Sequence, residues 1–239
     1  MASDSGKLDQ LISDLRAAHG DNLVSIVLYG SAAAGDQVNL RSDHNLLIAL
    51  ERITTDDLHA AHEALREWQK LGQPIPVYFT VEELQEAADV FPIEFLQMER
   101  ARKILFGRDP FEFVKISQAN LRHQTEYELR TSLIRLRRLY IPASASAQKL
   151  ANLMTDSLAS FVALFRAVLI LNGQDPPVSK RDTVNAIVRL LDLEASPFES
   201  ILAVHSQKGS TLKEAEANTL FSNYMAQIER VIQAVDRIE

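Results

Sequence analysis

The chain has 239 residues, of which 46% are hydrophobic and 24% are charged, and its formal net charge is −7. This composition is ordinary for a globular protein of one large or two modest domains. The negative charge argues against broad, non-specific binding to nucleic acid. Because the chain has no cysteine, a disulfide framework, a thiolate metal site and a cysteine nucleophile are all excluded.

The sequence shows no targeting or membrane signal. The first ten residues are polar and acidic, without the basic and apolar segments of a signal peptide. The most apolar run, residues 158–171, contains Arg166 and is by itself too short to span a bilayer. We therefore expect a cytoplasmic protein without a membrane partner.

The first half of the chain is predicted to alternate helices with strands. Apolar residues at helical spacing predict a helix over residues 6–18. Short apolar runs predict strands, and capped amphipathic segments predict helices between them. The strands are expected at 23–29, 45–50, 75–79 and 103–106, and the helices at 54–70, from 81 onward, and at 91–100.

The character of two strands predicts their place in the sheet. The unbroken apolar run at 46–50 is typical of a central strand that is buried on both faces. Pro74 and Pro76 lack backbone N–H groups, so the strand at 75–79 is expected to begin at an edge.

From Phe113 onward the sequence has no strand candidate, and helical patterns follow one another. Helices are expected at 115–141, 146–172, 179–192 and 197–206, with a last helix that begins at the capping pattern Thr211-x-x-Glu214. The predicted class is therefore α+β. A domain over residues 1–112 carries a mixed sheet with flanking helices, and an all-α helical bundle follows over residues 113–239.

Residues 25–50 carry the pattern with the clearest chemistry. Gly30 follows a strand and allows a sharp turn, and Ser31 offers a hydroxyl and an N–H group to an anion. Asp43 precedes the next strand. Because side chains alternate along a strand, Asp43 and Asn45 share one face while His44 points to the other.

This arrangement resembles the polymerase-β-type nucleotidyltransferase superfamily, especially its small bacterial members and the aminoglycoside nucleotidyltransferases. The resemblance covers roughly the first 110 residues. The positions that match are Gly30, Ser31, Gly35, Arg41, Ser42 and Asp43. The resemblance implies that Gly30 and Ser31 hold the nucleotide phosphates, with Arg41 and Ser42 beside them, and that Asp43 is a ligand of Mg²⁺. It also implies that the helical part closes one side of a cleft and contributes to a homodimer.

One position departs from the family pattern and decides the functional expectation. Asn45 stands where the family has a second carboxylate, and the strand 75–80, where a third acid is expected, contains none. Magnesium favours anionic oxygen ligands, which an amide does not supply. Glu83 is better explained as part of a helix cap with Thr80. The remaining substitutes for the missing acids are Asp36, Glu82 and Glu83.

The predicted function is therefore that of a nucleotidyltransferase-like protein with a degenerate site at Asp43 and Asn45. It binds a nucleotide or another anion and has weak or no transfer activity. Two alternatives stay open. An active enzyme would use Mg²⁺ to transfer a nucleoside monophosphate from a nucleoside triphosphate to a hydroxyl group. A protein without this chemistry would be an interaction scaffold that forms a dimer through the helical bundle.

Other candidate residues have simpler explanations. Arg130 and Arg137 lie one heptad apart and suit phosphate, but an exposed helix face paired with Glu126 and Glu128 is favoured. His59 and His62 are expected at the surface, because no carboxylate accompanies them as a metal ligand. Neither an ATPase-type phosphate loop nor a nucleophile elbow is present in the sequence.

Overall fold

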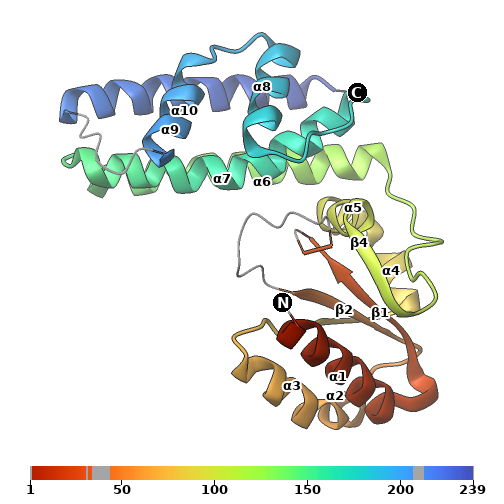
Figure 1. The fold of residues 1–239 in the computed structure, drawn as a ribbon. Coiled ribbons are helices and arrows are strands. Elements are labelled where there is room, and N and C mark those ends of the chain that lie inside the picture. Colours follow the sequence, from red (N-terminus) through yellow and green to blue (C-terminus); the bar gives the residue numbers. More distant parts are fainter. Residues whose placement is uncertain (1, 31, 34–43, 207–212, 239) are drawn as a thin grey trace. The chain divides into compact units, whose positions relative to one another are not determined.

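The computed structural model describes residues 2–30, 32–33, 44–206 and 213–238. The chain divides into two compact units, Met1–Ser117 and Gln118–Glu239 (Figure 1). Residues 113–117 belong to the first unit, since Val114 and Ile116 pack against its hydrophobic core. Each unit is described below on its own.

The first unit contains a mixed sheet in the strand order β3-β2-β1-β4. The strands are β1 (Leu23–Tyr29), β2 (Asn45–Leu50), β3 (Val77–Thr80) and β4 (Arg102–Gly107). β1 pairs antiparallel with both β2 and β4, whereas β2 and β3 run parallel. The predicted central position of β2 and the predicted edge position of β3 are both confirmed.

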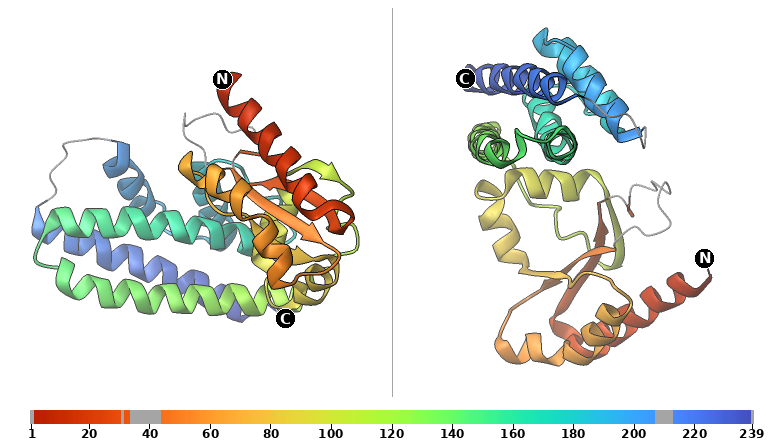
Figure 2. Two further views of the ribbon diagram at one scale, coloured as in Figure 1. Left: turned by 90° about the horizontal axis from the view of Figure 1, so that it is seen from below. Right: turned by 90° about the vertical axis from the view of Figure 1, so that its left-hand side faces the viewer.

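Helices cover both faces of this sheet (Figures 1 and 2). One face carries α1 (Ala2–His19), α2 (Thr55–Ala60) and α3 (His62–Lys70), and the other carries α4 (Val81–Glu86) and α5 (Pro92–Arg100). The helix predicted over 54–70 is wrong in one respect, because it is two helices. The Ala61 N–H bonds to the His59 carbonyl, which interrupts the regular helical hydrogen bonds at that point.

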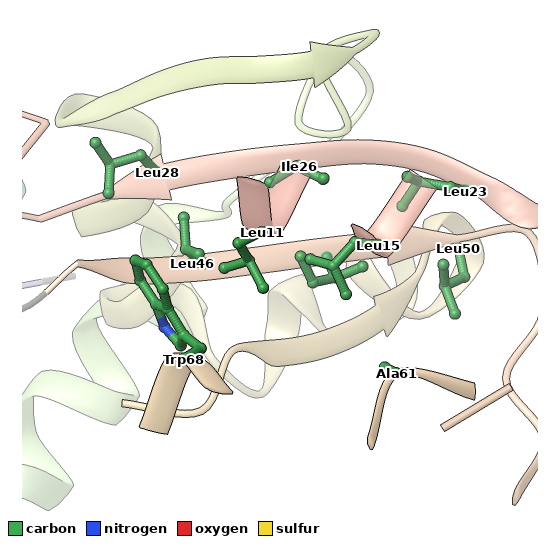
Figure 3. Packing of buried hydrophobic residues seen from close by; sticks show 10 residues of the cluster. Leu11, Leu15, Leu23, Ile26, Leu28, Leu46, Leu50, Ala61 and Trp68 are labelled. Atoms are coloured by element: carbon green, nitrogen blue, oxygen red, sulfur yellow. The ribbon is translucent and has the colours of Figure 1, made fainter. Parts of the chain in front are cut away.

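A separate hydrophobic core lies on each face of the sheet. Leu11 and Leu15 of α1 and Trp68 of α3 pack on Ile26 and Leu46 of the central strands (Figure 3). On the opposite face the core is formed by Val27, Leu47, Phe95, Met98 and Phe111. Both central strands are therefore buried on both sides, as their unbroken apolar sequences predict.

His19 is a buried polar residue at the end of α1. Its Nε2 lies 3.4 Å from the Tyr78 hydroxyl, and its Nδ1 has no hydrogen-bond partner among the described residues. Burial lowers the pKa of His19, and the negative charge of Asp57 opposes this shift only in part. The same environment raises the pKa of Tyr78 to about 12. The folded protein therefore favours the neutral imidazole.

The second unit is helical throughout its described residues. Its helices are α6 (Gln118–Ala143), α7 (Ala147–Leu171), α8 (Lys180–Leu191), α9 (Ser196–Ser206) and α10 (Glu214–Asp236). α6, α7 and α10 run side by side (Figure 2, left), and α8 and α9 also pack on α7. Phe161 and Phe165 of α7, Phe198 of α9 and Tyr224 of α10 form its aromatic core.

α7 has 25 residues and, by length and composition alone, is apolar enough to cross a membrane, although half of its most apolar window is buried inside the protein. Two expectations for the ends of the helices need correction. The helix expected to stop at Pro142 continues to Ala143, since a proline in the last turn removes only one backbone hydrogen bond. The last helix begins at Glu214, with Lys213 as its N-cap; Thr211 lies outside the described residues.

Replacement of Gly107 tests the pairing of β4 with β1. A Cβ at Gly107 would lie 1.9 Å from the Val24 carbonyl oxygen, whereas a Cβ at Gly20 would meet nothing within 4 Å. Both glycines have positive φ, so G20A is expected to lower the free energy of unfolding by about 1–2 kcal/mol. G107A should lower it further, because the β1 backbone must also move. Urea unfolding, followed by the fluorescence of the single tryptophan, Trp68, measures the free energy of unfolding of both variants. Equal losses of stability in G20A and G107A would contradict the close packing of Gly107 on Val24.

The burial of His19 predicts a pH dependence of stability. The folded-state pKa is depressed below the ordinary value of 6.5, so the stabilisation is present above that pH and is lost as the pH falls below it. H19Q removes the titrating group and should lose less stability on acidification than the unchanged protein. Urea unfolding at neutral and mildly acidic pH measures the difference. Equal losses of stability on acidification in H19Q and in the unchanged protein would show that the pKa of His19 is not depressed by folding.

Candidate functional site

The candidate site lies at one edge of the sheet, where β1 ends and where β2 and β4 begin. Tyr29 pairs with Asn45 on one side and with Arg102 on the other. Directly paired residues of antiparallel strands place their side chains on the same face. Tyr29 belongs to the core that contains Phe95, so the three side chains form a row on the face that α4 and α5 cover.

Gly30 forms the turn that leaves β1. Its φ is +80°, a conformation that favours glycine. Its N–H donates to the Ala101 carbonyl at 2.9 Å, and its carbonyl accepts from the Ala33 N–H at 3.0 Å. Both backbone groups of Gly30 are thus engaged, and the glycine ties the end of β1 to the residue before β4.

Asn45 lies directly against Gly30. A Cβ on Gly30 would be 3.4 Å from the Asn45 Nδ2 atom, so the carboxamide stands beside the open side of the glycine. Asn45 is half-buried, and its side chain makes no hydrogen bond to any other residue that the structure describes. Its donor and acceptor are therefore free to meet a group from outside this part of the chain.

Part of the predicted site lies outside the described residues. Ser31, Arg41, Ser42 and Asp43 are the predicted phosphate-binding and metal-binding residues, and none of the four is described. Gly35 and Asp36 lie outside as well. The described portion thus contains Gly30 and Asn45, which the sheet brings together, while the roles of the other four stay predictions.

No carboxylate takes the third position on β3. Val77 pairs with Leu47, so it lies on the same face as Asn45, and its side chain is exposed. Phe79 points to that face too, but its ring packs against Phe95 at 5.7 Å in the core. Val77 is therefore the position on β3 at which an acid could reach the site.

Glu82 and Glu83 are excluded as substitutes for the missing acid. β2 and β3 run parallel, with Leu50 opposite Thr80, so α4 begins at the opposite end of the sheet from Asn45. Five strand residues separate the two ends, which is about 16 Å at ordinary strand spacing. Glu83 also closes the predicted capping box, accepting from the Thr80 N–H at 2.7 Å.

The described donor set does not fit a pair of magnesium ions. Among the residues with described positions, no group of three or more histidine or acidic side chains could hold a metal. Asn45 supplies a neutral amide oxygen where the family pattern has a carboxylate, and Mg²⁺ binds preferentially to anionic oxygens. The segment 34–43, which lies outside the described residues, contains two further acids in the sequence, Asp36 and Asp43.

Arg102 and Tyr29 belong to this edge, but the sequence analysis did not identify them. The guanidinium of Arg102 lies 2.6 Å from the Asp109 carboxylate and over the Phe111 ring. Burial raises the pKa of Tyr29, so its hydroxyl stays protonated at neutral pH. Tyr29 could have been found from its place before Gly30. The position of Arg102 depends on the pairing of β4 with β1, for which no local signal exists.

His44 lies on the opposite face of β2, as the strand alternation predicts. The backbone N–H of His44 donates to the Gln73 side-chain oxygen at 2.8 Å, and the His44 ring packs edge-on against Trp68. A small open pocket of about 150 Å³ adjoins these residues, with Lys7 and Leu71 at its sides. His44 therefore anchors the start of β2 to the helical layer.

Three arginines of α6 are paired as on an ordinary helix surface, namely Arg122, Arg130 and Arg137. Glu126 lies 2.8 Å from Arg130 and 3.0 Å from Arg122, and these cations lower the pKa of Glu126. Arg137 pairs with Glu229 of α10 at 2.7 Å. The predicted pairing of Arg130 with Glu126 is confirmed. The predicted pairing with Glu128 is wrong, because Arg137 pairs with Glu229 instead.

The exposed histidines of α2 and α3 also fit the surface interpretation. The His59 and His62 rings are stacked with their centroids 6.0 Å apart. They belong to no cluster of three or more potential metal ligands within the described ranges. We therefore assign them no role in the site.

Comparisons with known proteins agree with the fold. No protein-family model and no curated protein match the sequence. The structure is similar to a crystal structure of spectinomycin adenyltransferase AAD(9) from Enterococcus faecialis with ATP and spectinomycin, at a TM-score of 0.59 and 16% identity. The similarity covers 95% of this chain and 98% of that one.

This likeness confirms the fold that the resemblance implies. The chain has a nucleotidyltransferase-type α+β fold, in which a mixed sheet with flanking helices precedes a helical region. Sequence identity of this order speaks to the fold alone. The activity has to be argued from the site itself, because one fold hosts many functions.

Proposed function

We propose that this protein is a nucleotidyltransferase-like binder of nucleotides or of other anions, with weak or no transfer activity. The observation that carries the proposal is Asn45, which stands where the family has a carboxylate and places beside Gly30 a carboxamide that no described residue pairs with. The fold it shares with an enzyme crystallised with ATP supports the nucleotide as the first ligand to test.

The chemistry of Asn45 favours an anion over a metal ion. A carboxylate only accepts hydrogen bonds, whereas a carboxamide also donates two. With one negative charge fewer at this edge, repulsion of a phosphate group falls and attraction of a divalent cation falls with it. The proposed ligand is therefore held by Ser31, Arg41, Ser42 and Asn45 without a need for Mg²⁺, and Gly30, which has no side chain, lets it approach the backbone closely.

The two alternatives remain distinguishable from this proposal. An active transferase requires Mg²⁺, with Asp43 as metal ligand and a second acid from the undescribed segment, for which Asp36 is the candidate. A scaffold requires no ligand at this edge and acts through the helical unit, including as a homodimer. For either binder or scaffold we propose a cytoplasmic protein without a membrane or broad nucleic-acid partner, in keeping with a net charge of −7 and no cysteine.

Thermal-shift titrations with ATP, GTP, CTP and UTP, each with and without Mg²⁺, test the proposal. A ligand that binds only the folded state raises the melting temperature as its concentration rises. We expect a shift with at least one nucleotide that does not depend on Mg²⁺. N45A should reduce this shift, because it removes the carboxamide and leaves the strand pairing intact.

The matched control is N152A, which truncates an exposed asparagine on α7 and should leave the nucleotide shift unchanged. A shift that appears only with Mg²⁺ would support the active transferase. No shift with any nucleotide would support the scaffold. An equal shift in N45A and in the unchanged protein would remove Asn45 from the proposed site.

Restoring acids at this edge tests its geometry. N45D combined with V77E places carboxylates on neighbouring strands of one face, where Asp43 can join them. The double variant should bind Mn²⁺, a paramagnetic substitute for Mg²⁺, at least about tenfold more tightly than the unchanged protein. Electron paramagnetic resonance of free Mn²⁺ measures the affinity.

The control for this variant is N45D with V90E, which has the same change of charge but places the second acid at an exposed position between η2 (Ala87–Asp89) and α5. It should gain less affinity than N45D with V77E. Equal affinity of the two double variants would show that Val77 does not face the same site as Asn45. N45D with F79E is unsuitable, because it would disrupt the packing of Phe79 on Phe95.

A further inference from the structure

A ridge of large apolar side chains runs along the solvent side of α6. Tyr127, Ile134 and Ile141 are seven residues apart in sequence, so they line up along one side of the helix. Their side chains are 61%, 57% and 74% exposed. At 1.5 Å per residue, this ridge extends for about 21 Å.

One flank of this α6 ridge is basic. Between residues 131 and 142 the sequence contains three arginines and no acidic residue. Arg138 lies about 40° around the helix from Ile134, and no described residue forms a hydrogen bond or ion pair with its guanidinium. On the other flank, Arg130 and Arg137 pair with Asp236 and Glu229 of α10.

We propose that the α6 ridge is the docking site of an acidic amphipathic helix from a partner protein. A partner helix with apolar residues at heptad spacing would cover Tyr127, Ile134 and Ile141. Acidic residues beside its apolar seam would meet Arg138 and its neighbours. This interaction surface is independent of the nucleotide site proposed above.

Charge argues against a second copy of this chain as the occupant. If two copies packed antiparallel through residues 131–142, each flank would meet its own counterpart, so Arg135 and Arg138 of one copy would face the same arginines of the other, and this stretch contains no acidic residue. Like charges placed across an interface oppose association. Any homodimer of the helical unit is therefore expected to use another face.

The shape of the patch favours a helix over a membrane surface. The apolar side chains form a single line, which one helix can cover along its length. Glu229 and Asp236 border this line on the α10 side. An anionic bilayer spreads over both flanks and would meet these carboxylates, whereas a helix can carry its acidic residues on the Arg138 flank alone.

The test uses a labelled synthetic peptide helix with leucines at its heptad a and d positions, glutamates along one flank of this seam and uncharged residues along the other. Fluorescence anisotropy should show saturable binding to the full chain. A second peptide with lysines in place of the glutamates should bind at least about tenfold more weakly. Binding should also weaken as salt concentration rises, because part of the attraction is electrostatic.

Variants then locate the peptide on the ridge. I134E with I141E should weaken binding of the acidic peptide at least about tenfold, and R138E should weaken it as well. V178E changes an equally exposed apolar residue of the same unit, 65% exposed, and should leave binding unchanged. Melting temperatures of all variants establish that each remains folded.

Three outcomes would overturn the proposal. The first is absence of peptide binding, and the second is equal binding of the acidic and lysine peptides. The third is a chain that does not bind the peptide but sediments with phosphatidylserine vesicles, provided that I134E with I141E abolishes this sedimentation. Light scattering that shows a dimer disrupted by I134E with I141E would assign the ridge to a second copy instead.

Discussion

The pairing of β1 with β2 is the constraint on which the first unit depends. Val27 and Leu47 face one core while Ile26 and Ile48 face the other, so both strands are fixed from both sides. A slip of one residue would move every side chain to the opposite core. The register that places Asn45 beside Gly30 is thus set by apolar packing and needs no polar contact within the site.

This separation of scaffold from site explains how the edge can carry either an asparagine or a carboxylate on the same fold. An asparagine has nearly the shape of an aspartate but none of its charge, and Asn45 keeps its place opposite Tyr29. Asp109, an acid beside this row, is bound to Arg102. The described row of Tyr29, Asn45 and Arg102 therefore offers hydrogen-bond donors and has no carboxylate of its own.

The elements of the chain were predictable wherever their signals are local. β1 and β2 follow from their apolar runs, and the caps at Thr54 and Thr80 follow from their spacing to Asp57 and Glu83. The break at Ala61 has no such signal, since alanine is a good helix former and the interruption arises from how its N–H is bonded.

The sequence predicts the features of the candidate site that depend on neighbouring residues, but not those that depend on the pairing of distant strands. Gly30, Asn45 and the opposite orientation of His44 follow from strand alternation. The position of Arg102 beside Tyr29, and the placement of Glu82 far from Asn45, depend on strand order and direction. These are long-range properties that no short sequence window contains, because they arise only when separate segments pair.

The central place of α7 has a consequence for the synthesis of the protein. This helix packs on α6, α8, α9 and α10, and its sequence is apolar enough to resemble a membrane span. Three of its four partners are C-terminal to it, so a ribosome releases α7 before most of its covering surface exists. Nascent chains that stop before α10 will expose this helix, and such chains are natural substrates for chaperones and proteases.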